Sequence, residues 1–373
     1  MSLPRVVLAG FYPPPFAGEP IHVKQLAAFL RARGLPVDVL NLNRHAPASH
    51  EYLSAPTPWA LMRLLFTLPD RASILHLHTN GHSWKSWLMI ATAAMTARLK
   101  GARAILTIHS GLFPGYVSTL GRFRRAVARR ILRPFARVIA VNREIGQAME
   151  RLGIARQDLA VIPAFLGVPQ SAELTADDRT VIGGFRPLLV AVGGGDRDPE
   201  LGLPTVVNAL GELVRRFPGL GAVFVGWQVG AKTQPLIEAR GLTAHAVCLG
   251  EVSHERCLSL LREADVVVRS TFADGDAITV REALDLGVPV VASDTAFRPA
   301  GVVLFRKGDV PDLLEKVTQV LSAPGARPER TAPTVQPAQD LWRIYADLMA
   351  GPSTPMTCSS RPSRDGRAPV IRP

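Results

Sequence analysis

The feature that most constrains the fold of this chain is an alternation of short apolar runs and longer helical segments, which starts twice. The first series consists of RVVLAG at 5–10, PVDVLNL at 36–42, SILHLHT at 73–79, ARAILTIHS at 102–110 and ARVIAVN at 136–142. Runs of this kind, rich in β-branched residues and joined through helices, form a parallel sheet that is covered on both faces. The first half of the chain therefore predicts a Rossmann-like domain.

A second series follows a polar, turn-rich stretch at 167–187. Its apolar runs are PLLVAVGGG at 187–195, AVFVGW at 222–227, HAVCLG at 245–250, ADVVVRS at 264–270 and PVVASD at 289–294. We predict an α/β chain with two Rossmann-like domains, at 1–168 and 169–350, whose parallel sheets face a cleft. An amphipathic helix at 339–350 is placed to cross back to the first domain. Residues 351–373 lack apolar periodicity and are predicted to be disordered.

Composition limits the classes of partner and compartment. Three cysteines without disulfide or zinc spacing favour a reducing cytoplasm. The N-terminus carries no signal-peptide pattern, and the longest apolar stretch, at 87–97, is too short to span a bilayer. Residues 1–168 have a formal charge of +14 and residues 169–373 a charge of −2. The basic excess belongs to the first half and bears on partners rather than on the fold.

An acidic loop between two apolar runs of the second half is the first candidate site. Its residues Asp274, Gly275, Asp276 and Ala277 follow a strand, and Glu282 lies in the next predicted helix. Backbone amides at a helix N-terminus can bind phosphate oxygens, while carboxylates accept hydrogen bonds from sugar hydroxyls. This combination suits a nucleotide sugar. The alternative is that the two aspartates cap the helix and that Glu282 is a solvated helix residue.

The spacing Asp274-x7-Glu282, followed by EALDLGVPVVASD, resembles the E-x7-E region of retaining GT-B glycosyltransferases of family 4. The branch it resembles occurs in bacterial polysaccharide-assembly enzymes. The resemblance implies a GT-B fold and transfer of a sugar from a nucleotide-diphosphate sugar to an acceptor hydroxyl. It implies that Glu282 holds the ribose and that Asp274 and the amides after it hold the donor sugar. The first acid here is Asp rather than Glu, and Gly275–Asp276 departs from the family's Phe-Gly pattern.

The resemblance extends into the first half. FAGEPIHVKQLAAFLRARG is similar to the family's glycine loop, with Gly18 in the second glycine position, and ILTIHSG at 105–111 is similar to the strand that ends in His-x-Gly. The resemblance implies that Gly18 lets the backbone approach a phosphate or sugar. It also implies that His109 contacts the donor sugar near the reacting carbon. A simple turn and a structural histidine are the alternatives.

Two patterns suggest a metal without requiring one. His76, His78 and His82 could form a zinc site, but they fit the H-V-H-type strand end of the family better. Asp274-Gly275-Asp276 also spells the D-x-D metal signature of a different glycosyltransferase fold, against which the two-domain pattern argues. We therefore expect no metal, and no cofactor apart from the nucleotide sugar as co-substrate.

One departure from the family concerns the leaving diphosphate. Gly194 and Leu201 stand where the family has the Arg and Lys that bind it. A cation stabilises the negative charge that develops on a departing group. Arg197 and Arg269 are the candidates to substitute. The alternative is a catalytically weak or inactive subunit that binds nucleotide sugars.

The basic excess is densest at 121–138, which holds seven arginines. Arg122, Arg125, Arg129 and Arg133 recur at helical spacing opposite an apolar face. The resemblance assigns the acceptor to the first domain. We predict that this helix contacts anionic lipid at the inner face of the membrane and that the acceptor is a glycan or is lipid-linked. A solvated arginine-rich face is the alternative. No recognition motif accompanies the charge, so nucleic acid is not an expected partner.

Overall fold

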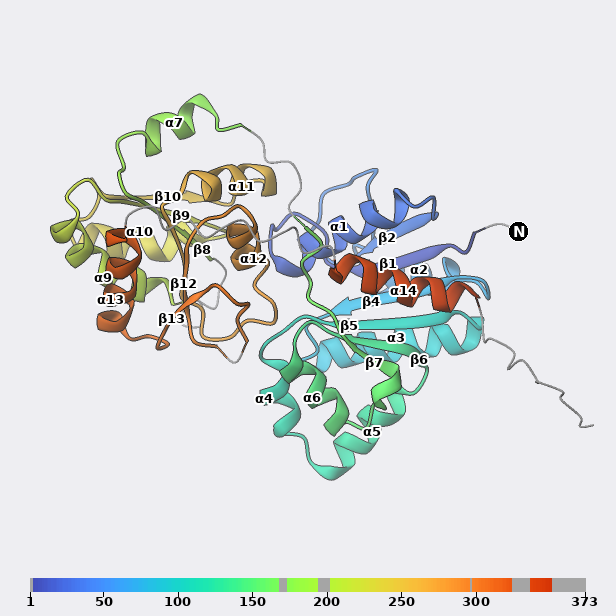
Figure 1. Ribbon diagram of the computed structural model, residues 1–373. Coiled ribbons are helices and arrows are strands. Elements are labelled where there is room, and N and C mark those ends of the chain that lie inside the picture. Colours follow the sequence, from blue (N-terminus) through green and yellow to red (C-terminus); the bar gives the residue numbers. More distant parts are fainter. Residues whose placement is uncertain (1–2, 168–172, 194–201, 296, 324–335, 351–373) are drawn as a thin grey trace, which may run out of the picture.

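The computed structural model describes residues 3–167, 173–193, 202–295, 297–323 and 336–350. In these residues the chain forms two parallel sheets with helices on both faces, one sheet in each half of the sequence (Figure 1). The predicted pair of Rossmann-like domains is confirmed. The predicted tail at 351–373 lies outside the described residues.

The first sheet has the strand order β3-β2-β1-β4-β5-β6-β7, and its pairings are parallel. Its strands are β1 (Val6–Gly10), β2 (Val37–Asn41), β3 (Leu53–Ser54), β4 (Ile74–Thr79), β5 (Arg103–Ile108), β6 (Phe135–Ala140) and β7 (Leu159–Val161). Along β1, Val6 and Leu8 pack into one hydrophobic core, and Val7 and Ala9 into another. Successive side chains of a strand point to opposite faces. Both faces of the sheet are therefore apolar, as its uninterrupted apolar runs predict.

Helices cover both faces of the first sheet. One face carries α1 (Gly18–Arg31). The other carries α2 (Pro58–Thr67), α3 (Trp84–Lys100), α4 (Phe113–Ser118), α5 (Arg122–Leu132) and α6 (Arg143–Arg151). Helix α3 shows why these segments begin and end where they do: the Ser83 hydroxyl accepts a hydrogen bond from the Ser86 amide, and Gly101 ends the helix in the left-handed conformation. A short 3-10 turn, η1 (Arg156–Asp158), precedes β7.

The second sheet has the strand order β10-β9-β8-β11-β12-β13 and is also parallel. Its strands are β8 (Leu188–Val192), β9 (Gly221–Val225), β10 (Ala246–Gly250), β11 (Val266–Arg269), β12 (Val290–Ser293) and β13 (Val303–Phe305). One face packs against α9 (Leu203–Arg216), α10 (Val229–Ala239) and α13 (Val310–Ser322). The other packs against α7 (Ala176–Ile182), α11 (His254–Glu263) and α12 (Ile278–Asp285).

The last described helix, α14 (Gln336–Ala350), lies on the first sheet beside α1 rather than on the second (Figure 1). Leu341, Ile344 and Tyr345 are buried in the core on the α1 face. The Tyr345 hydroxyl is 2.6 Å from Nδ1 of His76 on β4. The segment 169–350 therefore contains a helix that belongs structurally to the first domain.

Each sheet reverses its strand order beside its first strand, at β1/β4 and at β8/β11. Loops that leave the carboxyl ends of neighbouring strands diverge at such a point and open a crevice for a ligand. The acidic loop follows β11 and therefore lies at the crevice of the second domain. None of the helices in the described ranges is long and apolar enough to cross a membrane.

Candidate active site

A cavity of about 450 Å³ lies between the two domains, at the carboxyl ends of both sheets. The predicted donor-site residues that the structure describes all line it, and they are Gly18, His109, Arg269, Asp274, Gly275, Asp276, Ala277 and Glu282. Arg197 lies outside the described residues. The four predicted arginines around α5 are not among the described residues that line the cavity. The cavity therefore gathers the donor-site candidates and leaves the basic helix elsewhere.

Asp274 is held between two arginines. Arg269 Nη2 lies 2.7 Å from its Oδ1, and Arg298 Nη1 lies 2.6 Å from its Oδ2. The Thr271 hydroxyl also donates to this carboxylate. Burial acts to raise the pKa of Asp274, but the arginine charges and hydrogen bonds outweigh burial and hold the pKa below its usual range. The carboxylate is ionised, and the two cations leave a net positive charge beside the cavity.

Arg298 is a site residue that the sequence patterns did not indicate. It lies in the loop after β12, and its side chain is 3 % exposed. Its Nε donates to the Ser293 carbonyl at 3.1 Å, and its Nη2 donates to the Thr271 hydroxyl at 3.1 Å. Burial lowers the pKa of Arg298, an effect that the Asp274 charge opposes. Its position after a strand of the second sheet is the one signal that could have singled it out.

Glu282 faces the cavity from α12 and has a partner that was not predicted. Its Oε1 lies 2.6 Å from Nε2 of His254, the first residue of α11, and Glu282 is 1 % exposed. Side chains of a helix lean toward its N-terminus, which is the end of α12 at the cavity. The alternative of a solvated helix residue is wrong for Glu282. His254 fixes the orientation of the carboxylate and leaves its second oxygen for a ligand.

The acidic loop also forms a contact between the domains. The Gly275 carbonyl accepts a hydrogen bond from Asn142 Nδ2 at 2.5 Å, and Asp276 Oδ2 accepts one from the Ala164 amide at 2.8 Å. The other oxygen of Asp276 pairs with Arg281 Nε at 2.6 Å. The capping alternative fails, because the N-cap of α12 is Ala277 and it has no side-chain cap bond. Both oxygens of Asp276 are bonded within the protein, one of them across the domain boundary, and its role in donor binding stays a prediction.

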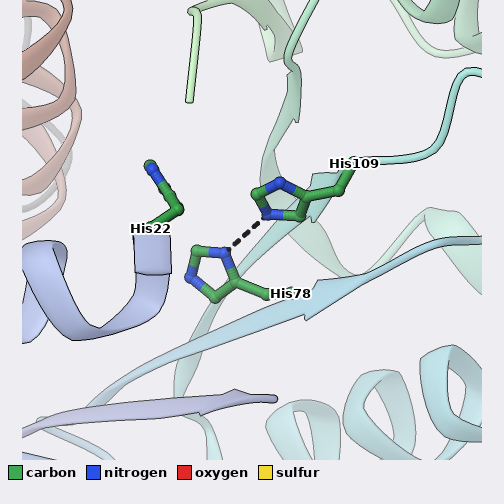
Figure 2. Close-up of side chains that lie close together, drawn as sticks. All are labelled: His22, His78 and His109. Carbon is green, nitrogen blue, oxygen red and sulfur yellow. Dashed lines mark hydrogen bonds between the residues drawn. The ribbon is translucent and has the colours of Figure 1, made fainter. Parts of the chain in front are cut away.

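Three histidines meet at the first-domain side of the cavity. Figure 2 shows His22 from α1, His78 from β4 and His109 from the end of β5 with their rings close together. His78 Nδ1 and His109 Nε2 are 3.1 Å apart, and His22 Nδ1 lies 2.5 Å from the Ala164 carbonyl. Burial lowers the pKa of His22 to about 4 and lowers those of His78 and His109 well below the usual value. All three rings are therefore neutral at pH 7.

A fourth histidine, His76 on β4, has a hydrogen-bond partner at each ring nitrogen. Nδ1 lies 2.6 Å from the Tyr345 hydroxyl and Nε2 lies 2.7 Å from the Thr107 hydroxyl. His76 is the third residue of β4 rather than a strand-end residue, and the absence of a metal stays a prediction. Neutral imidazoles are ligands that zinc accepts, and one nitrogen from each of His22, His78 and His109 lies within 4.8 Å of the others. The hydrogen bonds of these three rings already use three of their nitrogens, and His78 Nε2 is buried without a hydrogen-bond partner.

Glu19 also lines the cavity, and the sequence patterns did not indicate it. It follows Gly18 at the start of α1 and is 8 % exposed. Its Oε1 accepts a hydrogen bond from the Phe11 amide at 3.4 Å. Burial raises the pKa of Glu19 to about 7, only partly offset by this bond. A carboxyl group with such a pKa in a cleft is a candidate functional group.

Two family models match the two domains. Residues 6–164 match the model described as "Glycosyl transferase 4-like domain", and residues 188–332 match "Glycosyl transferases group 1". A phosphatidyl-myo-inositol mannosyltransferase of Mycobacterium tuberculosis is 28 % identical over 322 residues, which are 80 % of this chain and 78 % of that protein. The protein of the same name from Mycolicibacterium smegmatis is 28 % identical over 311 residues, 75 % of this chain and 74 % of the relative.

Solved structures share the architecture at low sequence identity. Sucrose-phosphate synthase from Thermosynechococcus elongatus superposes with a TM-score of 0.70 and 18 % identity, over 93 % of this chain and 99 % of that one. Anabaena HepE in complex with UDP-glucose superposes with a TM-score of 0.65 and 16 % identity, over 93 % and 96 %. At such identities these likenesses concern the fold, which is the predicted GT-B fold.

Proposed function

Because this chain belongs to the GT-B glycosyltransferases of family 4, we propose that it moves a sugar from a nucleotide-diphosphate sugar to an acceptor hydroxyl with retention at the anomeric carbon. The observation that carries the proposal is the interdomain cavity, where an ionised Asp274 between two arginines lies close to Glu282 and His109. Hydrogen-bond acceptors for hydroxyls and cations for a diphosphate meet there, which is the set of groups that a nucleotide sugar needs.

The donor is placed by the second domain. Glu282, held by His254, accepts hydrogen bonds from the ribose hydroxyls. The backbone amides at the start of α12 line the cavity and bind the diphosphate. Arg269 lines the cavity too, and Arg298 adds a second positive charge through the Asp274 carboxylate that both arginines contact. In this proposal the pair replaces the Arg and Lys that the family has at the positions of Gly194 and Leu201. Its two positive charges exceed the single negative charge of Asp274, so a net positive charge is left for the diphosphate. By analogy with the loss of an oxyanion-hole donor, we expect removal of one of these cations to raise the barrier by about 2–4 kcal/mol.

The reaction then needs no protein nucleophile. The departing diphosphate accepts the proton of the acceptor hydroxyl, while Asp274 and the neutral His109 hold the sugar. The acceptor oxygen therefore bonds to the anomeric carbon on the face from which the diphosphate departs. Attack on that face retains the anomeric configuration. Gly18 leaves open the backbone approach at the start of α1, where a Cβ would meet nothing within 4 Å. Arginine charges face the leaving group in this scheme, so we propose that the nucleotide sugar is the co-substrate and that no further cofactor takes part.

For the acceptor we propose a glycan or a lipid-linked hydroxyl compound, in the assembly of a cell-surface polysaccharide or glycolipid at the cytoplasmic side of a membrane. Two observations support this: the first domain carries the basic excess, and the name of the mycobacterial relatives describes a lipid substrate. We do not propose the relatives' own substrate for this chain. We propose only the class of acceptor, a hydroxyl group that is attached to an anionic lipid.

The test is a thermal-shift screen against UDP-, GDP- and ADP-sugars, followed by turnover measurements with the donor that binds. A ligand that binds only the folded state increases the free energy of unfolding, by about 2.7 kcal/mol at a ligand concentration of a hundred times its Kd. The melting temperature rises as a result. We expect one nucleotide family to stabilise the protein and the Glu282→Gln variant to lose the shift. Stabilisation without any transfer would favour the alternative, an inactive nucleotide-sugar-binding subunit. No stabilisation by any donor would overturn the proposal.

A further inference from the structure

Large apolar side chains are exposed on the outer side of helices α2, α3 and α5, which cover the face of the first sheet opposite α1. Trp84 is 69 % exposed, Leu88 61 % and Leu99 68 % on α3, and Phe123 is 81 % exposed on α5. Trp59 on α2 is 84 % exposed. Helix α3 packs against both α2 and α5, so these residues lie on one contiguous layer. We call this surface, formed by the exposed side chains of α2, α3 and α5, the outer helix face.

The exposed apolar residues of α3 lie on one side of the helix. Its exposed apolar residues lie at 84, 88, 95 and 99, spacings of four and seven residues that place them on one side of a helix. The opposite side of α3 is buried in the core of the first domain through Ile90, Ala93 and Ala97. The helix is therefore apolar on both sides, one of which packs on the sheet while the other has no partner in the described chain. Large apolar side chains that are exposed together on neighbouring helices indicate an interaction site.

Charge identifies the partner. Helices α2, α3 and α5 contain nine Lys and Arg and no Asp or Glu. Within the described ranges, none of these nine cations forms an ion pair. Arg122 and Arg124 lie in the first turn of α5, where a cation opposes the helix dipole and lowers helix stability. The sequence keeps cations on this surface even where they disfavour the helix that carries them.

We propose that the outer helix face docks on an anionic lipid surface, with the tryptophans, leucines and Phe123 inserted at the headgroup boundary and the arginines and lysines on the phosphates. This docking deepens the proposed function, on which it rests for the reason why a lipid-linked acceptor meets the first domain. Apolar side chains with flanking cations are the composition that binds such interfaces. A second copy of this chain fits less well, because a twofold interface would place the same cations against one another.

The experiment is sedimentation of the full chain with phosphatidylglycerol vesicles and with phosphatidylcholine vesicles, at low and high salt. One variant carries Trp84→Gln and Leu88→Gln, which retain helix propensity, and a second carries Arg122→Gln and Arg124→Gln. We expect selective binding to phosphatidylglycerol that weakens with salt. The arginine variant should lower affinity about 25-fold, at about fivefold for each basic residue, and the apolar variant about tenfold or more.

A matched control changes the same residue types on the second domain, with Leu304→Gln and Arg240→Gln, both exposed. It should bind like the wild type. Circular dichroism melts check that every variant is folded. Equal binding to both vesicle types, unchanged binding in both test variants, or a dimer in sedimentation velocity that the Trp84/Leu88 variant dissociates would each overturn the proposal. The vesicle assay contains no sugar, so docking without transfer would refute only the proposed function, and transfer without docking would refute only this inference.

Discussion

Replacing Gly275 with alanine tests whether the domains must touch at the acidic loop for the enzyme to work. A Cβ at this position would lie 1.7 Å from the carbonyl oxygen of His109, whereas real Cβ atoms essentially never come closer than 3.0 Å. The two loops would therefore have to separate by about 1.3 Å. Because His109 and Asp274 approach the same cavity from opposite domains, this movement would displace one relative to the other.

The expected cost follows from this displacement. A misplacement of about 1 Å can lower a rate about 100-fold, which is about 2.7 kcal/mol of barrier. We expect kcat/KM of Gly275→Ala to fall about 10- to 100-fold. The melting temperature should change little, since the residue lies at the contact between domains and outside either hydrophobic core. Initial rates of sugar transfer and a thermal melt measure the two quantities.

A second variant and a control sharpen this test. A Cβ at Gly111 would lie 2.3 Å from the Asp274 carbonyl oxygen, so Gly111→Ala obstructs the same contact from the other domain. The double variant should lose much less than the sum of the two single losses, because both act on one contact. Gly211→Ala on α9, where a Cβ meets nothing within 4 Å, should leave the rate unchanged. Wild-type rates in Gly275→Ala would refute the reasoning.

Three other predictions concern single groups. Glu282→Gln should abolish stabilisation by the nucleotide sugar while the melting temperature of the free protein stays within a few degrees, and a retained shift in a thermal melt would contradict the ribose assignment. Arg298→Gln should raise the barrier to transfer by about 2–4 kcal/mol in a rate assay in which Arg240→Gln is unaffected; normal rates would mean that another cation serves the diphosphate. Burial raises the pKa of Glu19 from 4.5 to about 7, so the unfolded chain releases this proton at lower pH than the folded chain. Stability should fall as pH rises from about 4.5 to about 7, by up to about 3 kcal/mol. Glu19→Gln should remove that decline, and equal pH slopes in denaturant melts of both proteins would disprove it.

The sequence predicted the fold, and the strand ends from which the candidate site residues reach one cavity, because both depend on short-range patterns. The apolar run that ends at Val268 and the turn formers after it place the acidic loop at the end of a parallel strand without any knowledge of tertiary structure. Topology then fixes which strand ends meet, since parallel α/β domains open their crevices where the strand order reverses. His109 directly follows β5 and Asp274 lies in the loop after β11, so both could be identified in this way. Glu282 lies within α12 and was identified by its x7 spacing from Asp274 and by the family resemblance.

The pairings could not be predicted, because they join residues that are remote in sequence. Arg298 reaches Asp274 across 24 positions, and His254 reaches Glu282 across 28. Asp276 meets the Ala164 amide across 112 positions and a domain boundary. A carboxylate in a strand-end loop predicts a polar site, but its partners depend on how the domains close. For the same reason, the loop sequence did not indicate that Asp276 bonds to Arg281 and to the Ala164 amide, and its predicted role in donor binding is still a prediction.

Helix α14 makes the second domain an insertion within the first. The chain leaves the first sheet after β7, completes the second sheet, and returns to bury Tyr345 against His76. The elements from α7 to α13 thus form one unit that is continuous in sequence, whereas the first domain consists of two separate pieces of sequence. In the proposed function the second domain places the donor, so a change of donor specificity, in evolution or in protein engineering, would require the replacement of one continuous segment only. The first domain can be transplanted only together with α14, its final helix.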